Sequence, residues 1–73
     1  MSFVMVELLD IRLLIATCRE QAEMVQRLSP NLLPLELLNR TAAAIGCLVP
    51  QLPDSILELA INEAASQMGI SAA

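Results

Sequence analysis

The stretch that decides the fold is FVMVELLDIRLLIATCREQAEMVQRL, residues 3–28, which contains no proline or glycine. Apolar side chains recur along it in alternating steps of four and three residues, the heptad spacing of a helix that packs along one stripe. The members of this heptad stripe are Val4, Leu8, Ile11, Ile15, Cys18, Ala22 and Val25. The pattern predicts one long helix over about residues 3–28.

Prolines mark the limits of a second helix. Pro30 and Pro34 end the first one, because proline inside a helix removes a hydrogen bond and clashes with the preceding turn. Pro34 is tolerated in a first helical turn, and Pro50 disfavours helical geometry in the residue before it. We therefore expect a helix over about residues 34–48. Its apolar stripe consists of Leu35, Leu38, Ala42 and Ile45.

A third helix is expected over about residues 56–68. Ser55 and Glu58 have the spacing of a capping box, in which each side chain binds the backbone N–H of the other residue. Gly69 suits the left-handed residue that ends many helices, and Ile70 can close an apolar contact behind it. The apolar stripe of this helix consists of Leu57, Ile61, Ala64 and Met68.

The composition indicates more apolar surface than a small domain can hide. Of the 73 residues, 56% are hydrophobic, compared with about 45–50% in ordinary soluble domains. A domain of this size buries only about 60% of the surface that its unfolded chain exposes. We therefore expect a single all-α domain over residues 1–73, with three helices, that associates as a helical-bundle homodimer.

The first helix is the expected site of association. Leu9, Leu13 and Ala16 form a second apolar row beside the heptad stripe, so this helix is hydrophobic nearly all round and has to be buried nearly all round. The two shorter helices can cover one side, and a second copy is the simplest cover for the other. We expect the heptad stripe to be the dimer seam. The candidates for binding a further protein are Leu9, Leu13, Leu32 and Leu33.

Charge argues against nucleic acid as a partner. The net charge is −4, from eight acidic residues and four arginines, whereas affinity for nucleic acid rests on neutralising phosphates with Lys and Arg. Ala42 and Gly46 have the spacing found at the bend of a helix-turn-helix, but Pro50 and Pro53 lie where its recognition helix should begin. We expect Gly46 to end the second helix or to allow close packing. A helix-turn-helix-like nucleic-acid-associated regulator is kept as the alternative function.

Enzyme chemistry is not expected. The chain has no His, Lys, Tyr or Trp, which removes the usual general bases and most groups that activate nucleophiles. Cys18 and Cys47 match no common spacing of zinc ligands, so we expect no metal and no cofactor. Both are expected to be free thiols in apolar helices. A disulfide between the helices, or across a dimer at Cys18, is the alternative.

The N-terminal segment is apolar but does not have the pattern of a signal peptide. It has no basic beginning, and Glu7, Asp10 and Arg12 interrupt its apolar run. The same charges argue against integral membrane insertion. The sequence thus favours a small cytoplasmic protein that works without catalysis, as an adaptor, chaperone or inhibitor that binds itself and an unidentified larger protein through apolar helix surface.

Overall fold

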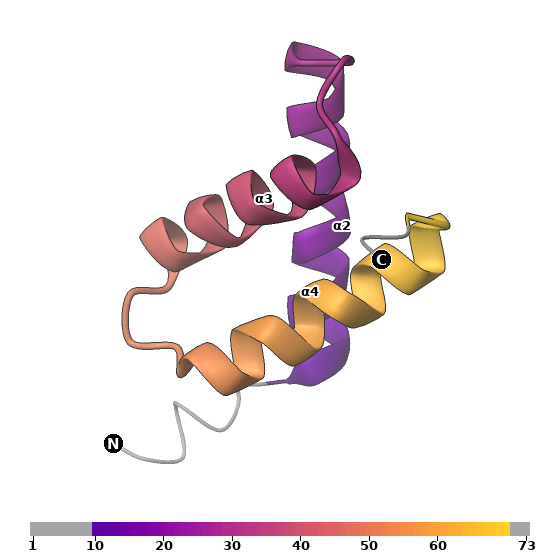
Figure 1. Cartoon of the computed structure of the whole chain (residues 1–73). Coiled ribbons are helices and arrows are strands. Elements are labelled where there is room, and N and C mark those ends of the chain that lie inside the picture. Colours follow the sequence, from indigo (N-terminus) through magenta and orange to yellow (C-terminus); the bar gives the residue numbers. More distant parts are fainter. Residues whose placement is uncertain (1–9, 71–73) are drawn as a thin grey trace.

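The described part of the chain folds as three α-helices, which confirms the all-α architecture expected from its sequence. The computed structural model describes residues 10–70. Over this range the helices are α2 (Ile11–Leu28), α3 (Pro34–Leu48) and α4 (Asp54–Met68). Each packs against the other two, and Figure 1 shows α3 and α4 running in opposite directions while both cross α2. All three helices contribute to one core.

Helix α2 begins later than its heptad pattern predicts. Asp10 is in an extended conformation (φ −61°, ψ 109°), and its carboxylate accepts a hydrogen bond from the backbone N–H of Arg12 at 3.1 Å. An aspartate in this position satisfies one of the free N–H groups at a helix start, so it caps the helix. A continuous helix from residue 3 through Asp10 is therefore wrong, and residues 3–9 lie outside the described residues. The end at Leu28 is as predicted.

Helix α3 has the predicted limits, Pro34 and Leu48. Hydrogen bonds between Leu33, before Pro34, and residues after Pro34 stabilise the start of the helix. The backbone N–H of Leu33 donates to the Glu36 carboxylate at 3.2 Å, and the carbonyl of Leu33 accepts from the N–H of Leu37 at 2.9 Å. The Glu36 contact is one half of a capping box, because leucine has no side-chain acceptor for the other half.

Helix α4 begins two residues before the predicted start, so the predicted Ser55–Glu58 capping box is wrong. Pro53 precedes the helix in an extended conformation, and its carbonyl accepts from the N–H groups of both Ile56 and Leu57, at 3.1 and 3.0 Å. Ser55 consequently lies inside the first turn rather than at the cap. The ring of Pro53 already holds φ at −62°, which favours starting the helix immediately after it.

The end of α4 is as predicted. Gly69 is left-handed, with φ +75°. Its N–H donates to the Ser66 carbonyl at 3.2 Å, and the N–H of Ile70 donates to the Ala65 carbonyl at 2.9 Å. These two bonds form a Schellman motif, in which a left-handed residue ends the helix and an apolar residue follows. Ile70 packs against the core, as expected.

The core lies where α2 meets the other two helices and is rich in small side chains. On α4 three of the four buried residues are alanines, whose short side chains permit a close approach of neighbouring helices. Thr41 is buried on α3, and its hydroxyl donates to the Leu37 carbonyl at 2.8 Å. The buried core cluster consists of Leu14, Cys18, Leu38, Ile45, Leu52, Ala60, Ile61, Ala64 and Ala65.

Gly46 has neither of the roles expected for it. It lies inside α3, which continues to Leu48, so it does not end the helix. A Cβ atom built on it would meet nothing within 4 Å, so it does not permit a close approach. A glycine inside a helix without a packing role costs stability, because it loses more backbone freedom on folding than other residues.

Replacing each of the two glycines with alanine should change the stability of the fold in opposite directions. We expect Gly46→Ala to raise the free energy of unfolding by about 0.5–1 kcal/mol, since the added methyl group enters open space in a helix. Gly69→Ala should lower it by about 1–2 kcal/mol, because alanine is strained at positive φ. Urea denaturation followed by circular dichroism measures both. A destabilised Gly46→Ala variant would show that a neighbour packs against this position.

Candidate functional site

The heptad stripe of α2 is its inward face. Cys18 and Ala22 are 0% and 2% exposed in a single chain, and Ile15 is half-buried against the core. Val25 is also half-buried, Ile11 is at the edge of this face with 36% exposure, and Val4 and Leu8 lie outside the described residues. A side chain without exposed surface cannot contact a second copy. A dimer seam through Cys18 and Ala22 is therefore wrong, because α3 and α4 of the same chain cover these positions.

The candidates for partner binding do not form one surface. Leu13, in the first turn of α2, and Leu33, just before α3, are 61% and 66% exposed. The chain reaches α3 from the far end of α2, so these two leucines belong to different parts of the molecule (Figure 1). Leu32 is half-buried, and Leu9 lies outside the described residues.

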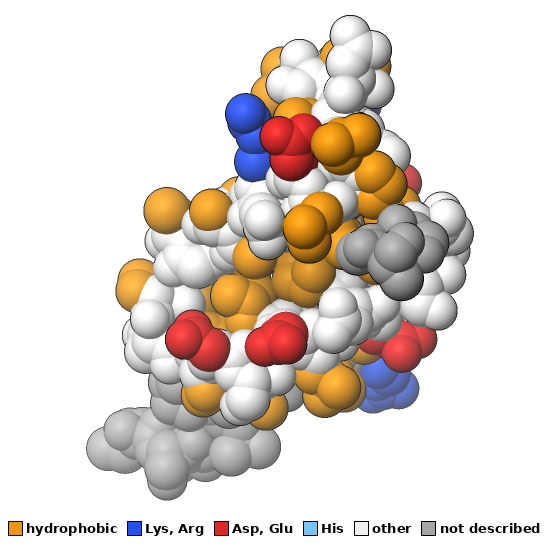
Figure 2. Space-filling view, in the orientation of Figure 1, with side chains coloured by type: hydrophobic (Ala, Val, Ile, Leu, Met, Phe, Trp, Pro, Cys, Tyr) orange, Lys and Arg blue, Asp and Glu red, His pale blue; other side chains and the backbone are white. Residues whose placement is uncertain are grey.

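A groove between α3 and α4 brings other residues together. It has a volume of about 460 Å³. Figure 2 shows hydrophobic side chains gathered in a hollow on this face, with acidic side chains along its edge. Leu38 and Ile61 in this groove are buried, whereas Ala42 and Leu57 are half-buried. The residues that line the α3–α4 groove are Leu35, Leu38, Asn39, Ala42, Asp54, Leu57, Glu58, Ile61 and Asn62.

Helical spacing explains why these residues share a groove. On α3 they fall within 35–42 and on α4 within 54–62, in both cases at steps of three, four and seven that keep them on one helix face. The apolar stripes of both helices are predicted from the sequence, but their incomplete contact is not. Ala42, which has a short side chain, lines the groove on the α3 side. The signal that could have indicated the groove is the polar row Asp54, Glu58 and Asn62 beside the α4 stripe.

The groove has an apolar floor and a negatively charged edge. Asp54 and Glu58 are both exposed and four residues apart, so their carboxylates lie on the same side of α4. Asn39 and Asn62 add neutral amides, and no Lys or Arg is among the lining residues. The edge therefore attracts cations, while Leu35, which is 57% exposed, offers apolar surface at the mouth.

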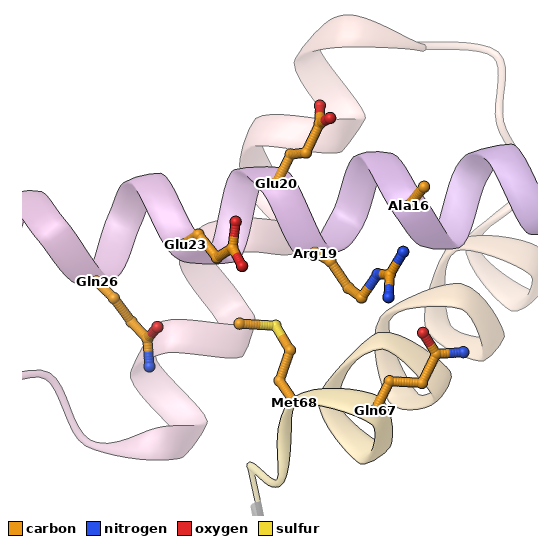
Figure 3. A pocket seen from close by; sticks show the side chains of 7 residues that line it. All are labelled: Ala16, Arg19, Glu20, Glu23, Gln26, Gln67 and Met68. Atoms are coloured by element: carbon orange, nitrogen blue, oxygen red, sulfur yellow. The ribbon is translucent and has the colours of Figure 1, made fainter.

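A second hollow, of about 560 Å³, lies between α2 and the end of α4. Its charged side chains have mixed signs, with Arg19 beside Glu20 and Glu23 on α2. In Figure 3 the Met68 side chain extends from α4 toward α2, and Glu20 points away from the other side chains. These groups do not converge on a common point, and no Ser, Thr, Cys, Lys or His is among the lining residues. This hollow has the character of a solvated polar surface.

Two kinds of polar feature would mark a buried ligand site: unpaired buried atoms and clustered metal ligands. Between residues 10 and 70, every buried side-chain nitrogen or oxygen has a hydrogen-bond partner. In the same range no group of three His, Cys, Asp or Glu side chains is placed to hold a metal ion. None of the three described helices is both long and apolar enough to cross a membrane.

The two thiols have different surroundings. Cys18 is buried on α2 and Cys47 is exposed on α3, and both are free. Burial raises the pKa of the Cys18 thiol above its ordinary range, because the thiolate is poorly solvated in the core. The thiolate is the reactive form, so Cys18 is protected both by burial and by its protonation.

The chain matches no protein family, and no curated protein or solved structure is significantly similar to it. The function therefore has to be inferred from the groove and from the exposed side chains.

Thiol reactivity should separate Cys47 from Cys18. With Ellman's reagent at mildly alkaline pH, we expect one thiol per native chain to react rapidly and the second only after denaturation. Cys47→Ser should abolish the rapid phase, and Cys18→Ser should leave it unchanged. Two rapid thiols in the native protein would contradict the buried position of Cys18.

Proposed function

We propose that this chain is a non-enzymatic protein–protein interaction module, a small adaptor, chaperone or inhibitor that binds a larger protein through the α3–α4 groove. The observation that carries the proposal is an open groove with an apolar floor between two helices of a 73-residue chain. Grooves of this kind are used to bind amphipathic helices, whose apolar side chains insert at helical spacing.

Leu35 and the floor of the groove account for affinity in this proposal. Binding energy at protein interfaces is concentrated in a few large, well-packed side chains surrounded by near-neutral contacts. Leu35 is exposed in the free chain, whereas Leu38 and Ile61 are already buried. A partner that covers Leu35 and contacts Leu57 removes apolar surface from water, at about 25 cal/mol for each Å².

Self-association is part of the same proposal, through exposed side chains instead of the buried part of the heptad stripe. A single chain leaves large apolar residues exposed on all three described helices, and most soluble oligomers are symmetric homo-oligomers. Covering such side chains with a second copy would reduce their contact with water. The exposed large apolar residues are Ile11, Leu13, Met24, Leu28, Leu33, Leu35, Leu48 and Leu59.

The helix-turn-helix alternative gains no support from α4. The helix that would enter the major groove exposes Glu58 and Glu63, and its sequence contains no Lys or Arg. Acidic side chains repel phosphates, and no positive charge on this helix offsets them. Ala42 and Gly46 both lie within α3, so the bend that their spacing suggests is absent at that point.

Two exposed leucines on α3 provide a matched test of the groove. Leu35 lines it and Leu48 does not, although they are 57% and 60% exposed. We expect Leu35→Ala to weaken capture of the partner from native cell extract by at least about 30-fold, the loss of a 2 kcal/mol contact. Leu48→Ala should leave capture unchanged. Both variants should unfold within about 1 kcal/mol of the parent, as surface substitutions do.

Quantitative mass spectrometry of the captured proteins, with each variant as bait, measures this difference. Equal capture by the parent and Leu35→Ala would show that the groove is not the docking site. A loss of capture shared by both leucine variants would also contradict the proposal.

The proposed homodimer is tested separately by sedimentation equilibrium. At micromolar concentration we expect a mass at least twice that of the 7.9 kDa chain. The midpoint of thermal unfolding should also rise with protein concentration, because dissociation is linked to unfolding. A mass of one chain at all concentrations would exclude the homodimer.

A further inference from the structure

We infer that the occupant of the α3–α4 groove is a cationic amphipathic helix of the partner protein. Its apolar side chains contact the floor of the groove, and its Lys or Arg side chains lie against Asp54 and Glu58. This inference rests on the proposed function and names the chemistry of the partner.

The shape of the groove favours a helix as the occupant. Its walls are single faces of two helices that pack against each other, so the groove follows the direction of α3 and α4. The lining residues of α4 span 54–62, a rise of about 12 Å at 1.5 Å per residue. This length corresponds to about two turns of a bound helix, enough for anchors at positions i, i+3 or i+4, and i+7.

The charged residues of the groove favour an occupant of positive charge. Asp54 lies in the first turn of α4, where the positive end of the helix dipole partly offsets its charge. Glu58 lies one turn further on, where this compensation is weaker, and no cation lines the groove. An acidic helix would place like charges against this edge, whereas a basic helix meets two carboxylates.

The same charges argue against a second copy in the groove. Each chain carries eight acidic residues against four arginines, so bringing two copies together here adds negative charge to a negative edge. Leu59, the exposed apolar residue of α4, is accompanied by the exposed acidic residues Glu58 and Glu63. Complementary charge on the partner speeds encounter and suppresses wrong partners more than it raises affinity.

Two synthetic peptides test the inference with the intact chain. Each is a helix of about 14 residues, four turns, with one leucine stripe. The first carries lysine at the positions flanking the stripe, and the second carries glutamate at the same positions. Fluorescence anisotropy of the labelled peptides measures binding to the purified protein at about 50 mM and about 500 mM salt, which differ severalfold in screening length.

We expect the lysine peptide to bind and the glutamate peptide to bind at least 10-fold more weakly at low salt. The neutral double variant Asp54→Asn/Glu58→Gln should lose about 3- to 30-fold in affinity for the lysine peptide, since exposed ion pairs are individually weak. The control is Glu20→Gln/Glu63→Gln, which changes the net charge equally but alters no residue of the groove. It should bind the lysine peptide as the parent does. Glu58→Lys should reduce the ratio between the affinities for the lysine peptide and for the glutamate peptide.

Several results would overturn the inference. Equal binding of the two peptides, or equal weakening by both neutral double variants, would show that the groove does not select a cationic helix. If neither peptide binds while capture still depends on Leu35, the groove docks a partner of another kind and only this inference fails. If Leu35→Ala converts a dimer to monomers in sedimentation, a second copy occupies the groove. If the lysine peptide binds but Leu35→Ala captures as much partner protein as the parent does, the proposed function is the part that fails.

Discussion

The packing of α3 and α4 onto the inward face of α2 is the interaction on which the rest of the structure depends. At 15 residues each, α3 and α4 are marginal as isolated helices, and tertiary contact has to stabilise them. The middle of α2 presents the small side chains Cys18 and Ala22, both buried. Small residues there let two helices reach the same stretch of α2, and this sets how α3 and α4 lie beside each other.

Local chemistry explains which parts of the fold could be predicted. Pro34 fixes its own φ, and Gly69 adopts the left-handed conformation without the steric cost that other residues have, so the boundaries that they mark agree with the structure. Whether Ser55 or Asp10 caps a helix depends instead on competition with neighbouring residues. Pro53 starts α4 before Ser55 can cap it, and Asp10 caps α2 instead of continuing a helix. Periodicity alone contains no information about such competition.

The candidate site shows the same division between local and tertiary information. The heptad stripe correctly marks a face of α2 that is buried, but a stripe does not specify whether its cover comes from the same chain or from another. The stripes containing Ala42 and Leu57 were likewise visible in the sequence, whereas the gap between them arises from how α3 and α4 meet. That gap is a property of the packed pair, so no pattern within either helix predicts it.

The short connection between α3 and α4 has a consequence for any ligand of the groove. Leu52 is buried in the core, its N–H donates to the Val49 carbonyl at 3.1 Å, and Pro50 and Pro53 restrict the backbone on either side. The connection is thus anchored, and the walls of the groove are in place before anything binds. A preorganised site loses little conformational entropy on association, so more of the contact energy is kept as affinity. If the groove binds a ligand as proposed, residues of this connection would affect its affinity without touching it.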